Sequence, residues 1–104
     1  MKMKKTLTRR QIFSLLQKNQ DTLQKYAVKR IGLFGSYAIG NQTPKSDIDF
    51  IVEFEKPTFD NFMGLCFYLE KLFRKKVDVL TAEGVESIRI KEVAENIKKS
   101  VIYA

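Results

Sequence analysis

A segment with strict two-residue alternation constrains the fold of this chain more than any other feature. Residues 47–54 read Asp-Ile-Asp-Phe-Ile-Val-Glu-Phe, and successive side chains of a β-strand point to opposite faces of a sheet. One face of this predicted strand is wholly apolar, so a helix has to cover it. The other face begins with Asp47 and Asp49, which lie about 6 to 7 Å apart along a strand.

This spacing lets the two carboxylates share one or two divalent cations. Magnesium prefers hard oxygen ligands, usually keeps some of its waters, and takes further oxygens from substrate phosphates. Asp47 and Asp49 alone form an incomplete protein shell. The pair is therefore typical of a site for a metal-bound nucleotide.

A turn suited to phosphate precedes the two carboxylates. Residues 31–34 (Ile-Gly-Leu-Phe) predict a buried strand that ends at Gly35 and Ser36, where a short helical turn should begin. A glycine lets the backbone approach a ligand closely, and amides at a helix start bind anions. The Ser36 hydroxyl can add a hydrogen bond to a phosphate oxygen. The loop at 40–46 then leads into the acidic strand, so phosphate and metal sites should come from adjacent segments.

Asp78 is the candidate for a third carboxylate. It lies within residues 76–80 (Lys-Val-Asp-Val-Leu), a short β-branched run, where a charged residue is costly unless it is paired or bound to metal. If this strand lies beside residues 47–54 with Asp78 on the same face, the three aspartates converge. The alternative is a strand-edge aspartate paired with one of the basic residues at 74–76.

The order of these features resembles the signature of the polymerase-beta-like nucleotidyltransferase superfamily. Gly35-Ser36 is followed by ten residues, then by Asp47-Ile48-Asp49 and a later strand with Asp78. The small size is similar to that of minimal nucleotidyltransferases. The resemblance implies an α/β (α+β) fold, a small mixed β-sheet flanked by helices. It also implies that Gly35 and Ser36 bind the phosphates of ATP, that Asp47 and Asp49 bind two Mg²⁺ ions, and that Asp78 supports the acceptor hydroxyl as a third catalytic and metal-binding carboxylate.

Minimal members of this superfamily resemble antitoxins paired with HEPN-domain ribonuclease toxins, and some transfer AMP from ATP to a tyrosine of the toxin. The resemblance therefore implies an Mg-dependent protein adenylyltransferase with a HEPN toxin as partner. We expect it in the cytoplasm, because the sequence shows neither a signal peptide nor a membrane span. Two alternatives stay open: a non-catalytic antitoxin that neutralises the toxin by binding, and nucleotidyl transfer to a small molecule or to RNA.

Ile39 departs from the motif, because many minimal members have an arginine at this place. An arginine clamps phosphate oxygens with two parallel hydrogen bonds, and an isoleucine cannot. We expect Lys45 to supply the positive charge to the nucleotide, with Lys29 and Arg30 as further candidates.

The remaining sequence predicts a single domain over residues 1–104 with helices around the sheet. Thr8 and Gln11 have capping-box spacing, so a helix should begin at Thr8, and a second short one should run through Leu23 and Tyr26. The apolar positions from Phe62 to Phe73 follow a helical period and should cover the apolar face of strand 47–54. A last helix is expected from near Ser87, becoming extended around residue 100.

Composition excludes several other classes of function. Histidine is absent, which excludes the usual catalytic triads and histidine-ligated zinc. Cys66 is the only cysteine and falls on the apolar helix stripe, which predicts a small core residue. The N-terminus lacks the apolar core of a signal peptide, and no stretch reaches the length of a membrane span. The net charge of +7 suits docking to an acidic protein better than contact with nucleic acid, since no RNA-recognition signature is visible.

Overall fold

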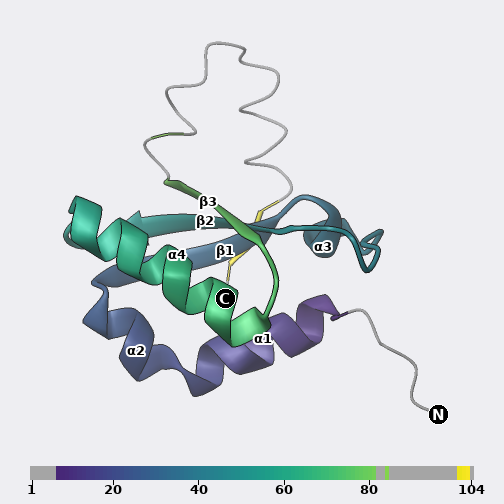
Figure 1. Ribbon diagram of the computed structural model, residues 1–104, viewed down its shortest axis with the longest axis horizontal. Helices are drawn as coiled ribbons and strands as arrows, with labels where there is room; N and C mark the ends of the chain where they lie inside the picture. The colour runs from purple at the N-terminus through teal and green to yellow at the C-terminus, as the bar shows by residue number, and fades with distance from the viewer. Residues whose placement is uncertain (1–6, 82–83, 85–100, 104) are drawn as a thin grey trace.

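A computed structural model describes residues 7–81, 84 and 101–103 of the chain. Four strands form one mixed sheet in the order β3-β2-β1-β4, in which β2 and β3 are parallel and β1 is antiparallel to both β2 and β4. Figure 1 shows α1, α2 and α4 grouped against the sheet and α3 at one end of it. The predicted small mixed sheet flanked by helices is thereby confirmed. The elements along the chain are α1 (Arg9–Lys18), α2 (Gln20–Lys25), β1 (Val28–Phe34), α3 (Ser36–Ile39), β2 (Ile48–Phe54), α4 (Phe59–Phe73), β3 (Val77–Thr81) and β4 (Ile102–Tyr103).

The capping box at the start of α1 forms as the sequence predicts. The Thr8 hydroxyl accepts a hydrogen bond from the Gln11 amide at 3.2 Å, and the Gln11 side chain accepts one from the Thr8 amide at 2.9 Å. These bonds satisfy two of the amides that have no partner inside a helix. The backbone at the N-terminus of α1 is therefore held in a fixed position.

The alternation in β2 produces the core. Ile48, Phe50 and Val52 are fully buried, and each such side chain contributes about 1.5 to 3 kcal/mol relative to an exposed one. The ring of Phe50 lies against that of Phe73 with centroids 5.8 Å apart. Helix α4 thus covers the apolar face of β2, as predicted from its stripe. Cys66 on this helix is half-buried, and burial raises the pKa of its thiol.

The C-terminal part of the chain returns to the sheet. Ile102 and Tyr103 pair with Leu33 and Gly32 as the edge strand β4, which agrees with the expected extended backbone after residue 100. A side chain at Gly32 would come within 2.9 Å of the Tyr103 ring. The predicted helix from near Ser87 lies outside the described residues.

Candidate active site

Strand pairing places the predicted acids and the predicted phosphate turn at one end of the sheet. Asp49 in β2 lies opposite Phe34, the last residue of β1, and next to Asp78 in the parallel strand β3. Gly35 follows Phe34 directly. Asp49 is thus central, with the turn on one side and Asp78 on the other.

Asp49 and Asp78 interact directly through their side chains. Burial, the negative charge of Asp78, a side-chain hydrogen bond with Asp78 and the charge of Asp47, in that order of importance, together raise the pKa of Asp49 to about 6. A hydrogen bond between two carboxyl groups requires a shared proton, because two carboxylates repel each other. The alternative of an Asp78 paired with the basic residues at 74–76 is not observed: among the described residues, both ion pairs involve Glu53.

Two features of the structure require a glycine at position 35. Its φ of +75° and ψ of −152° belong to a region that only glycine adopts readily. A Cβ atom at this position would also collide with the Asp49 Oδ2 atom. Gly35 therefore lets the turn pass directly over the carboxylate, which brings any group bound by the turn next to Asp49.

The helical turn predicted after Gly35 is α3. Its first backbone hydrogen bonds are made by the amides of Ala38 and Ile39, which donate to the Gly35 carbonyl at 3.1 and 3.2 Å. The amides of Ser36 and Tyr37 precede these donors, so they are the ones that a helix start leaves without an intrahelical partner. The turn thus offers two amides and the Ser36 hydroxyl beside Asp49.

Asp47 lies at the entrance to β2, one residue before the strand begins. Its charge contributes to the raised pKa of Asp49 and, after burial, to that of Tyr37. Tyr37 is 1 % exposed, and its hydroxyl has no hydrogen-bond partner within the part of the chain that the structure describes. In that same part, no cluster of three or more acidic or cysteine side chains is gathered closely enough to hold a metal ion. Asp49 and Asp78 are therefore paired, whereas Asp47 acts on Asp49 only through its charge.

The candidate cations lie in different places. Arg30 and Lys29 contact Glu53, with Arg30 Nε 3.4 Å and Lys29 Nζ 3.9 Å from its carboxylate oxygens. Glu53 is four residues from Asp49 along β2, which corresponds to roughly 13 Å. The expectation that Lys29 or Arg30 supplies charge at the turn is therefore wrong, because the strand register carries both to the far end. Lys45 lies in the exposed loop between α3 and β2, closer along the chain to Asp47.

One cation that contacts the turn was missed by the sequence reasoning. Arg9, the first residue of α1, donates a hydrogen bond from Nη1 to the carbonyl of Ala38 in α3 at 2.6 Å. The capping box fixes where α1 begins, but no pattern in the sequence relates position 9 to position 38. Only the packing of α1 beside α3 reveals this contact.

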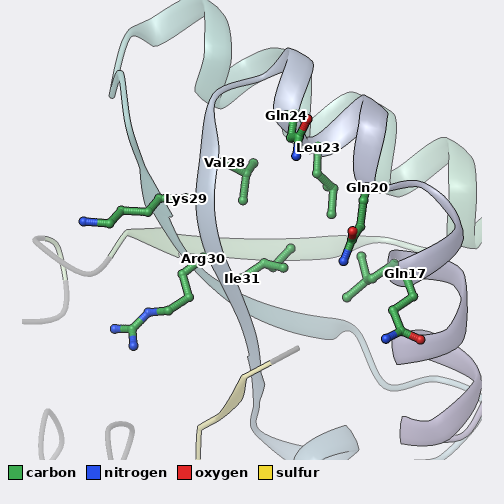
Figure 2. Close-up of a pocket in the computed structure, with 9 residues that line it drawn as sticks. Gln17, Gln20, Leu23, Gln24, Val28, Lys29, Arg30 and Ile31 are labelled. Atoms are coloured by element: carbon green, nitrogen blue, oxygen red, sulfur yellow. The ribbon is translucent and has the colours of Figure 1, made fainter.

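A cavity of about 210 Å³ lies elsewhere, between the helices α1 and α2 and the first half of β1. Figure 2 shows Lys29 and Arg30 extending from β1 away from the helices that carry Gln17, Gln20 and Gln24. Neither the three aspartates nor the residues of the Gly35 turn line it. The acids and the turn, rather than this cavity, form the candidate active site.

The donor set at the acid pair fits a hard divalent cation. Asp49 and Asp78 offer only carboxylate oxygens, which magnesium prefers, and a cation between them would compete with a proton on Asp49, whose pKa is raised to about 6. A mixed sheet with such a pair beside a glycine-led turn is suited to chemistry on metal-bound phosphates.

Comparison with known proteins agrees with this class and refines it. Residues 15–104 match the model of the nucleotidyltransferase domain family. A relative from Methanocaldococcus jannaschii, provisionally named protein adenylyltransferase MJ1379, is 42% identical over 95% of this chain and 98% of its own length. Protein adenylyltransferase MntA from Thermococcus cleftensis is 33% identical over 93% of this chain and 96% of its own length. The chain belongs to the nucleotidyltransferase domain family, and the predicted enzyme class is confirmed.

Solved structures show the same fold. A structure provisionally described as a minimal nucleotidyltransferase superposes with a TM-score of 0.74 at 21% identity, covering 95% of this chain and 98% of the other. A chain of a toxin–antitoxin crystal structure with AMP-PNP superposes with a TM-score of 0.61 at 23% identity, covering 93% of this chain and 72% of the other. The predicted fold is therefore confirmed. Within the described residues, no helix has the length and apolar character needed to cross a membrane.

Proposed function

We propose that this nucleotidyltransferase transfers AMP from Mg-ATP to a hydroxyl group, most simply a tyrosine, of a HEPN-domain toxin in the cytoplasm, and so acts as the antitoxin of the pair. The observation that carries the proposal is the pairing of Asp49 with Asp78 directly beside the Gly35 turn. This arrangement would place the phosphates of a nucleotide within reach of the carboxylates.

The residues of the chain take distinct parts in the proposed reaction. The Ser36 hydroxyl and the amides of the turn bind the β- and γ-phosphates, and Lys45 adds positive charge from the loop. The acceptor oxygen attacks the α-phosphorus, the bond from that phosphorus to the bridging oxygen breaks, and pyrophosphate leaves. Asp78 holds the acceptor hydroxyl in line and accepts its proton, for which it has to be ionised.

Magnesium would be held by Asp49 and Asp78, with Asp47 as the third ligand. The bound ions would stabilise charge on the entering and leaving oxygens. Binding of the cation requires Asp49 to be ionised, so the raised pKa of Asp49 predicts weaker magnesium affinity below about pH 6.

The names of the relatives support a protein as the acceptor. Two of them carry the name protein adenylyltransferase, and one structural neighbour is part of a toxin–antitoxin complex with AMP-PNP. The acids of this chain lie at the end of a small open sheet, with Asp78 exposed. Such a site suits an acceptor presented by a second protein.

The test is the incubation of the protein with ATP labelled in the α-phosphate, magnesium, and the toxin encoded next to it. We expect label on the toxin with the unaltered chain and loss of label with Asp47→Asn, which keeps the side-chain volume. Equal labelling by Asp47→Asn, or no labelling by the unaltered chain, would defeat the proposal. Mass spectrometry of the labelled toxin would identify the acceptor residue.

One observation favours a second function, a non-catalytic antitoxin that neutralises the toxin by covering its surface. Ile39 is 64% exposed beside the turn, where its apolar side chain suits a protein contact better than a phosphate. Cells that express the toxin distinguish the two functions. If Asp49→Asn and Asp78→Asn variants protect as well as the unaltered chain, binding alone is sufficient.

A further inference from the structure

Arg9 is the one basic side chain that a hydrogen bond ties directly to α3 within the described residues. Its Nη1 atom donates to the Ala38 carbonyl at 2.6 Å, across 29 positions of sequence. A second long-range bond joins the same two regions, from Gln42 Nε2 to the Leu7 carbonyl at 3.0 Å. Together with the capping box at Thr8, these bonds fix the start of α1 against the turn and the loop that follows it.

The guanidinium of Arg9 retains unused donors. An arginine has five N–H donors, and the contact with Ala38 occupies one of them. Among the described residues no carboxylate lies within ion-pair distance of Arg9, since both ion pairs there belong to Glu53. Because Arg9 is exposed, its remaining N–H groups can reach an anion.

The bond to Ala38 places the Arg9 guanidinium against the same short helix that begins at Ser36. A helix rises about 1.5 Å per residue, so Ala38 lies roughly 3 Å along the axis from Ser36. The planar fork of an arginine binds two phosphate oxygens at once, which a lysine cannot do. Lys75, which precedes strand β3, is instead bonded through Nζ to the Pro44 carbonyl at 2.8 Å.

The negative charge of the three aspartates favours a protein cation near the phosphates of the nucleotide. Asp47, Asp49 and Asp78 give this end of the sheet a negative field, which opposes an approaching triphosphate unless metal and protein cations offset it. Ile39 contributes no charge, and Lys29 and Arg30 are bound to Glu53 at the other end of the strands.

We propose that Arg9 binds the β- and γ-phosphates of the nucleotide from α1, and thereby supplies the guanidinium charge that Ile39 does not. This inference rests on the proposed function, because it takes the position of the phosphates from it. It assigns to α1 a part in substrate binding in addition to its part in the core.

The test compares the binding of ATP and AMP, each with magnesium, by calorimetry. Arg9→Met keeps the length of the aliphatic chain and removes the charge, and Arg10→Met is the matched control on the same helix. Loss of a charge-assisted hydrogen bond corresponds to about a tenfold to hundredfold loss of affinity. We expect this loss for ATP with Arg9→Met, a change of less than about twofold for AMP, and no change with Arg10→Met.

A purely structural role for Arg9 gives a different result. It would lower the melting temperature and weaken the binding of ATP and AMP equally, and either equal weakening or an unchanged ATP affinity overturns the inference. Ile39→Arg in the Arg9→Met background sharpens the test, since it restores the charge without the bond to Ala38. We expect it to recover most of the ATP affinity, and failure to do so also counts against the inference.

The binding test of Arg9 and the labelling test of the proposed function can fail independently. Labelling of the toxin that persists in Arg9→Met with an unchanged ATP affinity overturns the inference and leaves the adenylyltransferase intact. Selective loss of ATP binding without labelling of the toxin by the unaltered chain supports the inference and overturns the proposed acceptor.

Discussion

The acidic residues at the two ends of β2 have opposite electrostatic surroundings. At one end Glu53 lies between Lys29 and Arg30, whose nitrogens are 3.9 and 3.4 Å from its oxygens. At the other end Asp49 lies beside Asp78, near Asp47, and its pKa is raised to about 6. One end holds two ordinary surface ion pairs, whereas the acids at the other end form no ion pair within the described residues. Repulsion between neighbouring carboxylates, as between Asp49 and Asp78, is typical of functional sites, where the carboxylates bind a cation.

The largest expected difference between the two ends concerns activity. Asp78→Asn removes one carboxylate of the pair without changing its size, and loss of such a ligand should lower the rate of AMP transfer at least about a hundredfold. Glu53→Gln, the equivalent change at the other end, should leave the rate unaltered. Initial rates of toxin labelling measure both. Similar rates for the two variants would contradict the assignment of the acidic end as the active site.

The next effect concerns the backbone that brings the turn onto the acids. Gly35→Ala would force a side chain into Asp49 and into a backbone region that glycine alone favours, at a cost of about 2 to 3 kcal/mol in the free energy of unfolding. Gly40→Ala is the matched control, because Gly40 also has a positive φ, +83°, but no atom lies within 4 Å of the added methyl group. It should cost about 1 kcal/mol. Urea denaturation would compare them, and equal losses would refute a close approach at Gly35.

The raised pKa of Asp49 predicts a dependence of stability on pH. Folded Asp49 keeps its proton up to about pH 6, whereas the ordinary value is 3.8, so between these values the folded state binds more protons than the unfolded state. The free energy of unfolding contributed by this group therefore falls as pH rises from about 4 to 6. Asp49 is only half-buried, so solvent screening reduces the fall to about 1 kcal/mol.

Asp49→Asn is the variant that isolates this contribution. It should be more stable than the unaltered chain by about 1 kcal/mol at pH 7.5, because the repulsion from Asp78 is removed. The stability difference between the two proteins should shrink below about pH 4. Added magnesium should stabilise the unaltered chain at pH 7.5 more than the variant. A difference that does not change with pH would show that the acids are too solvated to interact.

The smallest effect is expected for the ion pairs at the other end. Exposed pairs contribute about 0.5 kcal/mol or less, and the three side chains involved are 37 to 55% exposed. Glu53→Gln should therefore change the free energy of unfolding by no more than that amount. A larger loss in urea denaturation would mean that Glu53 organises the strand end, including the contact of Arg30 with the Tyr103 ring at 4.1 Å.

Local sequence rules were sufficient wherever the cause of a structure is local. The Thr8 cap, the buried strand at residues 31–34 and the turn after Gly35 form as predicted, because hydrogen bonds to near neighbours and side-chain periodicity decide them. The same rules failed for Lys29 and Arg30. Their distance from Asp49 depends on the antiparallel register of β1 with β2, which sequence spacing does not give.

The sequence by itself determined the elements, the apolar face of β2, and the order in which the turn and the three aspartates follow one another. Only the tertiary structure decided that Asp49 and Asp78 are neighbours while Asp47 stands apart, and that Arg9 meets α3. The physical reason is that periodicity and capping act within a few residues, whereas the parallel pairing of β2 with β3 and the packing of α1 join segments about 30 positions apart, and those contacts depend on how the whole core packs.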